Sequence, residues 1–548
     1  MRSEKKKKIE TAQERAEREL LRNSEIRNGE FIRYFGKEQE IVIPDTVTVI
    51  SDGAFQNNHR LTRLVLGKGV SYIGEGAFRG CIHLHDVVFP SGVRVIGKDA
   101  FRGCQSLVSV ILPKTTVSIG EGAFRGCRML SHMIISSGVE EIGAFAFCDC
   151  EALEELILPP NLQQIRRGTF FNCRALRSIE VPESVTTVGR YAFSCCEALE
   201  EMRLPDGITY LGSGAFAECR KLRSFDVPSR ATFVGDYAFS QCEALERIEI
   251  PESVTYIGIN AFCACHSLAS VRLPQQIIRL APEAFFNCTR LEEIEIPQSV
   301  REIGKRAFAF CTSLRSVRIL ADVPSIAEET FHSCFALEAI ALPDSVTSID
   351  DRAFYRCRSL ASVRLSGHLT AIEEQAFAKC ESLREMSLPA TLRRLEAGAF
   401  ADCTSLEIVV MPNRRISTER AIFAGCDGLR ILVVPDAYAL LSYRLDRWSV
   451  PLQAHVVSHA ELHYSLLIAE ASAADTPPER LPVLEEEIQK ARKHLRKRRA
   501  GADRTVELST ATESNTAAED PDHGDTPEVA PATEESLEEP ATADAPIE

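Results

Sequence analysis

Apolar side chains recur along this chain with a fixed period of 23 residues. If the phenylalanine of each unit is position zero, leucine occupies position six, and positions nine and eleven are always apolar. A second apolar pair, three residues apart, precedes the next phenylalanine. The phenylalanines of the 17 units are Phe55, Phe78, Phe101, Phe124, Phe147, Phe170, Phe193, Phe216, Phe239, Phe262, Phe285, Phe308, Phe331, Phe354, Phe377, Phe400 and Phe423.

This pattern predicts a stack of short coils. The apolar residues at positions nine and eleven, such as Ile248 and Ile250, alternate as in a strand with one buried face. Proline follows in 13 units, for example Pro251, and ends the strand because it has no N–H to donate. A single unit cannot bury its own apolar face. Stacked units can, so we predict a solenoid in which each coil contacts mainly its neighbours.

Cysteine occupies position three in every unit after the first. At one residue per coil, these side chains should line up inside the stack as small apolar thiols that donate to turn carbonyls. A metal site would need convergent ligands at short spacing. The three other cysteines, Cys148, Cys195 and Cys263, create no C-x-x-C pair. We therefore predict neither a zinc site nor a redox site.

The unit A-F-x-x-C-x-x-L-x-x-I-x-I-P-x-x-V-x-x-I-G resembles the BspA-like leucine-rich repeat, the 23-residue class of treponemal-type repeat proteins. The resemblance covers residues 41–435. It implies a leucine-rich repeat solenoid, a right-handed superhelix with a parallel β-sheet on its concave face and turns or short 3-10 segments outside. The segment from Phe31 to Ile43 resembles the N-terminal hairpin cap of such proteins. Exported members are associated with adhesion to host matrix proteins and to other cells.

Composition and charge indicate the class of protein and the cellular compartment to expect. The chain is 45% hydrophobic and 26% charged, which is typical of a folded protein. No window has the 18 or more uninterrupted apolar residues of a membrane span. The start, with Lys5 to Lys8, lacks the apolar stretch of a signal peptide. We therefore expect a cytoplasmic protein with reduced thiols, and we expect a monomer.

Motifs of catalysis are missing from the sequence. It contains no G-x-x-x-x-G-K-[ST], G-x-S-x-G, H-E-x-x-H or G-x-G-x-x-G motif, so we predict no enzyme, no cofactor and no small-molecule substrate. His455, His459 and His463 are four apart in a stretch that we expect to be helical, where they would share one face. They could bind a transition metal, but the polar boundary of an amphipathic helix is the interpretation that we favour.

The candidate binding residues lie at the outward positions of the strands. Position ten is aliphatic in the first five units and charged in the next seven, beginning with Glu180. A row of outward aliphatics on the concave face is a mark of an interaction site, although the N-terminal helix of the chain could cover it. His85 and His132 would form a polar rim. The aliphatic residues are Val65, Val88, Ile111, Ile134 and Ile157.

Positions four and seven alternate in charge through the middle units, for example Glu151 with Glu154 and then Arg174 with Arg177. Opposite charges on neighbouring strands stabilise modestly, so we expect a self-neutralising surface. A nucleic-acid groove would need one sign of charge along its length, so nucleic acid is an unfavourable partner.

The two ends differ from the repeats. We expect a charged helix over 1–27, a hairpin cap over 28–40, the solenoid over 41–435, a helical cap over 436–500 and a disordered tail over 501–548. The tail holds 14 acidic residues and one arginine, a net charge of −13, so it accounts for most of the total of −15. Seven of the ten residues from Lys490 to Arg499 are basic. They suit a helix C-terminus, or a patch for nucleic acid or anionic membrane.

These observations predict a non-enzymatic scaffold that binds a protein partner through its concave face. The alternative is a surface adhesin of the BspA type that binds host matrix proteins or other cells. A repeat fixes the scaffold and leaves recognition to a few outward residues, so the partner itself is not named by the sequence.

Overall fold

The computed structural model describes residues 18–436, 442–472, 483–484, 486–493 and 495. The chain separates into two compact units, Met1–His463 and Tyr464–Glu548, and the first contains the repeats. The predicted acidic tail lies outside the described residues, as do residues 1–17 of the predicted N-terminal helix and most of the basic run after Lys493.

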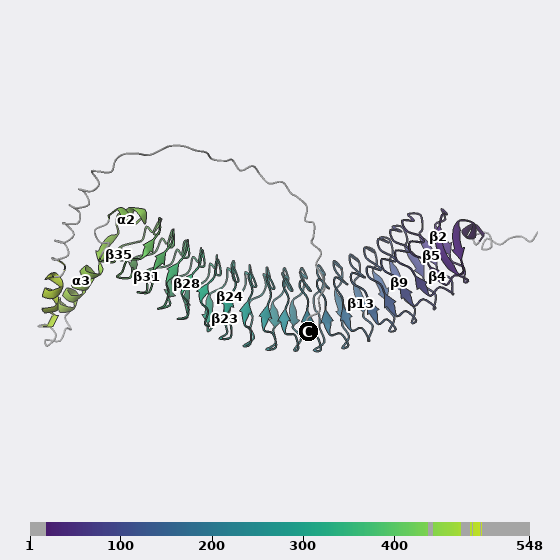
Figure 1. Cartoon of the computed structure of the whole chain (residues 1–548), viewed down its shortest axis with the longest axis horizontal. Helices are drawn as coiled ribbons and strands as arrows, with labels where there is room; N and C mark the ends of the chain where they lie inside the picture. Colours follow the sequence, from purple (N-terminus) through teal and green to yellow (C-terminus); the bar gives the residue numbers. More distant parts are fainter. Residues whose placement is uncertain (1–17, 437–441, 473–482, 485, 494, 496–548) are drawn as a thin grey trace, which may run out of the picture. The chain divides into compact units, whose positions relative to one another are not determined.

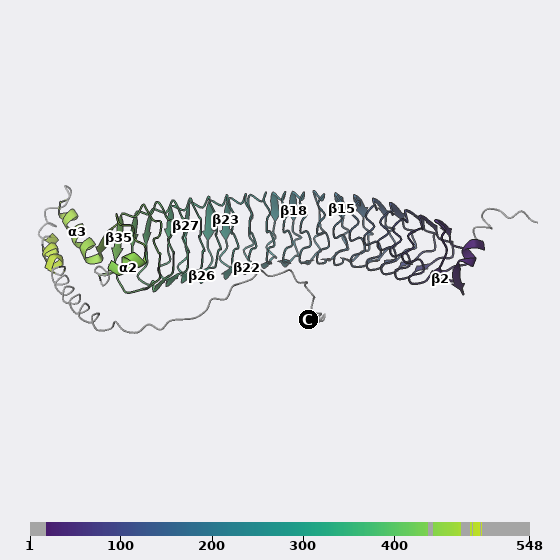
Figure 2. The same cartoon turned by 90° about the horizontal axis from the view of Figure 1, so that it is seen from above.

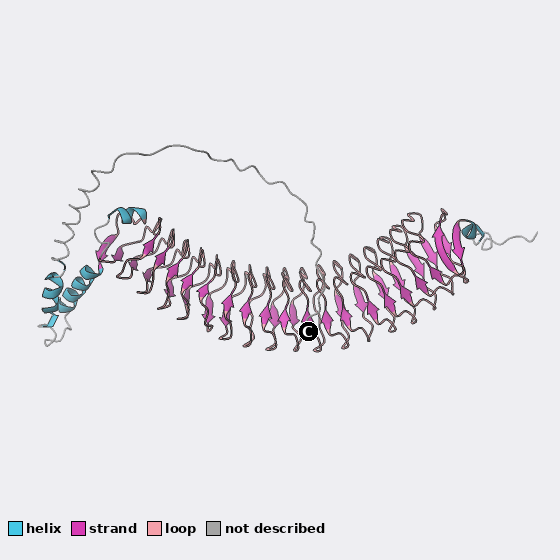
Figure 3. Ribbon diagram, in the orientation of Figure 1, coloured by secondary structure: helices cyan, strands magenta, loops and turns pink. Residues whose placement is uncertain are grey.

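Each repeat forms one coil of a parallel β-solenoid, as the sequence predicts (Figures 1 and 3). The residues at positions eight to ten form the long-strand row of the stack. Its strands are β3 Glu40–Val42, β5 Arg63–Val65, β7 Asp86–Val88, β9 Ser109–Ile111, β11 His132–Ile134, β13 Glu155–Ile157, β15 Ser178–Glu180, β18 Ser224–Asp226, β20 Arg247–Glu249, β23 Glu293–Ile296, β25 Ser316–Ile319, β27 Ala339–Ala341, β29 Ser362–Arg364, β31 Glu385–Ser387, β33 Ile408–Val410, β35 Ile431–Val434 and β36 His455–Ser458.

A second row of strands was not predicted. The end of the V-x-x-I segment forms a two-residue strand in each coil, and most of these strands pair in parallel with those of the next coil, so the stack has a short-strand row as well, interrupted at two places (Figure 2). These strands are β4 Val49–Ile50, β6 Tyr72–Ile73, β8 Val95–Ile96, β10 Ser118–Ile119, β12 Glu141–Ile142, β14 Gln164–Ile165, β16 Thr187–Val188, β17 Tyr210–Leu211, β19 Phe233–Val234, β21 Tyr256–Ile257, β22 Arg279–Leu280, β24 Glu302–Ile303, β26 Ser325–Ile326, β28 Ser348–Ile349, β30 Ala371–Ile372, β32 Arg394–Leu395 and β34 Ser417–Thr418.

The N-terminal hairpin starts earlier than the sequence indicates. Its strands are β1 Ser24–Arg27 and β2 Glu30–Tyr34, which pair in antiparallel fashion, whereas the predicted hairpin spanned 28–40. Strand β2 also pairs in parallel with β4 and so begins the short-strand row. Strand β3, which crosses the predicted boundary between cap and solenoid, is the first member of the long-strand row.

The C-terminal end holds one more coil than predicted. The solenoid was expected to end at Pro435, but β36 pairs in parallel with β35. Trp448, which is fully buried, belongs to this added coil, and its carbonyl accepts a 2.9 Å hydrogen bond from the Phe423 amide. Helices α2 Ser442–Arg447 and α3 His459–Ser472 flank this coil in the sequence.

The predicted helix of three histidines is therefore partly wrong. His455 belongs to β36, and only His459 and His463 belong to α3. The His459 ring nitrogen Nε2 lies 2.7 Å from the Met411 carbonyl oxygen. Strand pairing with the preceding coil has overridden the helical tendency of this stretch.

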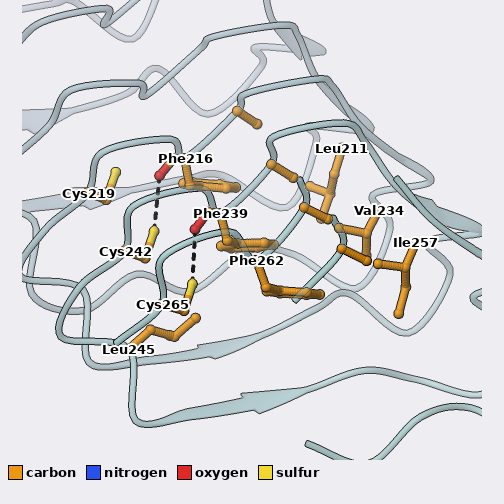
Figure 4. Packing of buried hydrophobic residues seen from close by; sticks show 14 of the residues in the cluster. Leu211, Phe216, Cys219, Val234, Phe239, Cys242, Leu245, Ile257, Phe262 and Cys265 are labelled. Carbon is orange, nitrogen blue, oxygen red and sulfur yellow. Dashed lines mark hydrogen bonds between the residues drawn. The ribbon is translucent and has the colours of Figure 1, made fainter. Parts of the chain in front are cut away.

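The core is a column of stacked phenylalanines. Each repeat phenylalanine lies parallel to the next, as Phe216, Phe239 and Phe262 show at centroid separations of 5.4 and 5.6 Å (Figure 4). Phe31, which precedes the first unit, stacks on Phe55 at 4.8 Å and begins the column. Since the rings are fully buried and aromatic, they supply much of the apolar burial that joins one coil to the next.

Beside this column runs a continuous ladder of thiols. Every repeat cysteine donates to the carbonyl of the phenylalanine 26 residues earlier, as Cys242 does to Phe216 at 3.2 Å and Cys265 to Phe239 at 3.2 Å (Figure 4). The series is unbroken from Cys81 on Phe55 to Cys426 on Phe400. The interpretation of these cysteines as buried donors to turn carbonyls is confirmed.

Replacing Cys242 with alanine is expected to lower the free energy of unfolding by about 1–2 kcal/mol, since a buried sulfur and one weak hydrogen bond are lost. The Phe216 carbonyl would keep its 3.2 Å bond from the Cys219 amide. Guanidinium denaturation followed by circular dichroism measures the change. Cys263→Ala is the matched control, because that thiol lies off the ladder and is half-buried. An equal loss in both variants would contradict a special role for the ladder.

Candidate protein-binding surface

The predicted aliphatic residues lie in one line on the strands of the first coils, within the long-strand row. Val88, Ile111, Ile134 and Ile157 are 43%, 65%, 58% and 73% exposed, while Val65 is half-buried. Val42 lies in β3, in register with Val65, and is 60% exposed. We call these six residues the apolar stripe: Val42, Val65, Val88, Ile111, Ile134 and Ile157.

Val42 was missed by the sequence analysis. It stands 23 residues before Val65, but it precedes the first phenylalanine of the repeat, so it was not counted among the residues at position ten. Extending the period one unit toward the N-terminus would have found it.

Parallel pairing aligns the stripe along the stack. Val42 pairs with Val65, Val65 with Val88, and Ile111 with Ile134. Neighbouring strands are about 4.8 Å apart, so the stripe presents one branched side chain per coil at that spacing. The flanking position eight is polar in each coil, as at Arg63 and Ser109.

The row of long strands is interrupted within the stripe. The first sheet ends at β11, and β13 pairs only with β15. An open hollow of about 610 Å³ lies at this interruption and contains both Ile134 and Ile157. Its lining is Ser131, His132, Met133, Ile134, Ile135, Glu154, Glu155, Leu156 and Ile157.

The two predicted rim histidines are separated. His132 lines the hollow, and its Nδ1 lies 2.8 Å from the Ser131 hydroxyl. His85 is also exposed but lies two coils away, at position seven, where its amide donates to the Thr62 carbonyl. Only His132 therefore borders the hollow.

Carboxylates gather at the C-terminal end of the stripe. Five exposed glutamates occupy outward positions seven, eight and ten of three successive coils, and in the described part of the chain none of them makes an ion pair. Arg177 and Arg203 are interspersed among them. We call the five glutamates the acidic end: Glu154, Glu155, Glu180, Glu200 and Glu201.

The alternating charges form the predicted ion pairs at position four and not at position seven. At position four, ion pairs join neighbouring coils: Arg128 to Glu151, Arg174 to Glu197 and Arg220 to Glu243, at 3.4, 3.7 and 3.7 Å. Position seven, which includes Glu154 and Glu200, contributes no ion pair among the residues that the structure describes. Of these two positions, only position four therefore neutralises its charges through ion pairs among the described residues.

Beyond the acidic end, position ten differs from the stripe. Arg318 pairs with Glu295 at 2.8 Å, and Asp226 lies 3.8 Å from Arg247. Near the C-terminus position ten is aliphatic again, but Val433 is only 1% exposed. The apolar residues of this row are thus open at the N-terminal coils and buried at the last ones.

The buried thiols offer no nucleophile. Burial raises the pKa of the fifteen ladder cysteines from Cys81 to Cys403, to about 12 for Cys81 and Cys311, so these thiols stay protonated at neutral pH. Burial likewise raises the pKa of Cys195 and Cys263, which are half-buried. Within the described ranges, no group of three or more histidine, cysteine or acidic side chains could hold a metal ion.

None of the described helices combines the length and the apolar character that crossing a bilayer requires.

Solved structures with similar coils come from several bacteria. A leucine-rich repeat protein from Bacteroides ovatus is 26% identical over 78% of this chain and 94% of that one, with a TM-score of 0.45. The leucine-rich repeat protein of T. pallidum is 29% identical over 38% and 91%, with a TM-score of 0.31. A leucine rich cell surface protein from Faecalibacterium prausnitzii is 24% identical over 69% and 89%, with a TM-score of 0.35. No curated protein matches significantly.

A family description matches most of the chain. The BspA type leucine rich repeat region matches residues 24–150, 117–246, 232–340 and 324–444, which together include the hairpin and all the repeats. No catalytic family is indicated. With its 23-residue coils in register throughout, this chain belongs to the BspA type leucine-rich repeat family.

Proposed function

We propose that this repeat scaffold is a non-enzymatic binding protein that engages a protein partner through the apolar stripe. The observation that carries the proposal is the exposure of Val88, Ile111, Ile134 and Ile157, in one line on neighbouring coils. Scattered surface aliphatics are ordinary, whereas a contiguous row beside a hollow marks an interaction site.

The surroundings favour protein over nucleic acid as the partner. The stripe ends in carboxylates, and the following coils carry mixed charges, such as the pair of Arg318 with Glu295. A polyanion would meet repulsion at the acidic end and no continuous basic track beyond it. A protein surface with apolar and basic groups matches both parts.

We place this activity in the cytoplasm and assign it to a monomer. All 19 cysteines are free thiols, which suits a reducing compartment. Cell fractionation and protease accessibility on intact cells test the location, and light scattering during gel filtration tests the monomer. Recovery of the chain on the outer surface would instead favour the adhesin alternative.

Replacing Val88, Ile111 and Ile134 together with lysine is expected to abolish partner binding, because three charges would be forced against an apolar partner surface. Quantitative mass spectrometry of material co-purified with wild type and variant measures the loss. The side chains are exposed, so the fold should tolerate the change.

The control introduces one lysine at the same position of a distant coil. Ala341→Lys does so at an exposed position ten and is expected to keep every partner. The proposed function is wrong if the stripe variant retains the partners that wild type and the control retain.

A further inference from the structure

The stripe has the dimensions of one secondary-structure element of a partner. Its residues from Val42 to Ile134 span four coil-to-coil steps, about 19 Å at about 4.8 Å per step, and Ile157 lies one coil further on, beyond the interruption between β11 and β13. It is one residue wide, because position eight on the same face is polar, as at Asp86 and His132. Such a surface fits a single rod with one apolar side chain per step.

The spacing of the stripe residues distinguishes a helical ligand from an extended one. One turn of an α-helix rises about 5.4 Å, which exceeds the spacing between coils by about 0.6 Å. The apolar residues of a helix therefore shift by only about 0.6 Å per coil relative to the stripe residues. An extended segment places same-face side chains about 6.8 Å apart and drifts by about 2 Å per coil, so it loses register within two coils. A helix of about 13 residues spans the stripe from Val42 to Ile134, and a longer helix also reaches Ile157 and the acidic end.

Strand addition at the end of the row is unfavourable as well. The free edge of the long-strand row is β3, and helical residues 18–22 stand beside it. Leu20 is 5% exposed and joins the core cluster, and it lines one small hollow together with Ile41 and Val42. The chain therefore occupies this edge itself, and the open apolar surface is the face of the strands.

Charge orients the helix. The acidic end begins in the coil of Ile157, and among the described residues it has no ion-pair partners, whereas Arg63 and Asp86 near the other end pair with each other at 3.1 Å. Basic side chains are favoured at a helix C-terminus by the helix dipole. At the opposite end, the Glu40 carboxylate in β3 suits the positive N-terminal end of the dipole.

We propose that the apolar stripe binds one amphipathic helix of a partner protein, apolar on one face and basic at its C-terminal end. The helix lies along the stack, with its N-terminus over β3 and its basic end against Glu154 and Glu155. This inference rests on the proposed function and adds the form, length and direction of the ligand.

Three synthetic peptides test this. The first is a fluorescein-labelled 18-residue helix with leucine at helical spacing and four arginines at its C-terminus. The second has the same composition with leucines at alternate positions, and the third is the helical peptide with its arginines at the N-terminus. Fluorescence anisotropy with the full chain should show at least about tenfold tighter binding of the first peptide.

Protein variants locate the binding. Ile134→Lys should weaken binding of the first peptide about tenfold or more, Glu154→Gln with Glu155→Gln should weaken it and reduce its salt dependence, and Ala341→Lys should leave it unchanged. Equal binding of the second peptide, or equal binding of the third, would overturn the helix or its direction.

The two proposals fail in different ways. If no peptide binds but the lysine variant of the stripe still loses its cellular partner, the helix inference is wrong and the proposed function stands. If the lysine variant keeps that partner, the proposed function is wrong. Binding of a peptide at the stripe would then show only that this surface is apolar, and not that it binds the partner.

Discussion

Replacing Phe239 with alanine is expected to lower the free energy of unfolding by about 3–5 kcal/mol, the usual cost of emptying a buried aromatic site. The ring is fully buried between Phe216 and Phe262, at 5.4 and 5.6 Å. The coils on both sides of the cavity would lose a contact, so the change acts on two interfaces at once. Because a solenoid holds together through its nearest neighbours, the stack should open first at this coil.

Guanidinium denaturation followed by circular dichroism measures the loss, and limited proteolysis with mass spectrometry shows where the chain is cut. Cuts should concentrate in the coil of Phe239 and its neighbours. Phe335→Ala is the matched control, since that half-buried ring lies off the column, with Arg358 over its face at 5.1 Å, and should cost well under half as much. Equal losses would show that the column has no special role.

The regular part of the fold could be predicted because equivalent residues pack in the same way in every coil. A phenylalanine, a cysteine and a leucine three residues apart must all point inward in a coil this small, and Phe239, Cys242 and Leu245 do so. The thiol ladder follows, because a buried S–H needs an acceptor and the turn carbonyls supply one. The repetition of the unit makes such local reasoning reliable.

The short-strand row was missed for a physical reason. Its strands have only two residues, such as Tyr256–Ile257, which is too few to show the alternation of a strand. The rows form because stacking brings identical segments of adjacent coils side by side. The signal is thus in the stack and not in the local sequence.

The ends were misjudged because their spacing changes. Phe31 precedes Phe55 by 24 residues and Trp448 follows Phe423 by 25, so a strict period of 23 finds neither. Both side chains are nevertheless fully buried, as the repeat phenylalanines are. A search that allowed one or two extra residues, or a tryptophan in place of phenylalanine, would have extended the solenoid at both ends.

The candidate surface was accessible to sequence reasoning only in part. Once position ten was recognised as outward, the exposure of Ile111 and Ile157 followed. The hollow did not, because it arises where β11 and β13 fail to pair, and nothing in the motif indicates that break. The free carboxylates of the acidic end also required side-chain positions, since alternating charges had predicted ion pairs.

Raising the pH above about 9 is expected to unfold the solenoid cooperatively. Burial raises the pKa of the fifteen ladder thiols from Cys81 to Cys403. In the unfolded chain, the pKa of cysteine is about 8.5. The folded state therefore holds protons that the unfolded state releases. This stabilisation is complete below about pH 8.5 and is lost as pH rises toward the folded pKa values.

Each buried thiol then removes about 1.4 kcal/mol of stability per pH unit. Fifteen of them together remove on the order of 20 kcal/mol per unit, which exceeds the net stability of most domains. Thiolate absorbance near 240 nm should consequently appear together with the loss of circular dichroism, and both should reverse on neutralisation under reducing conditions. A variant with Cys195→Ser and Cys263→Ser, the two half-buried thiols, should unfold over nearly the same pH range, since the fifteen ladder thiols dominate the transition. Thiolate formation in a chain that keeps its circular dichroism would mean that the ladder is open to solvent.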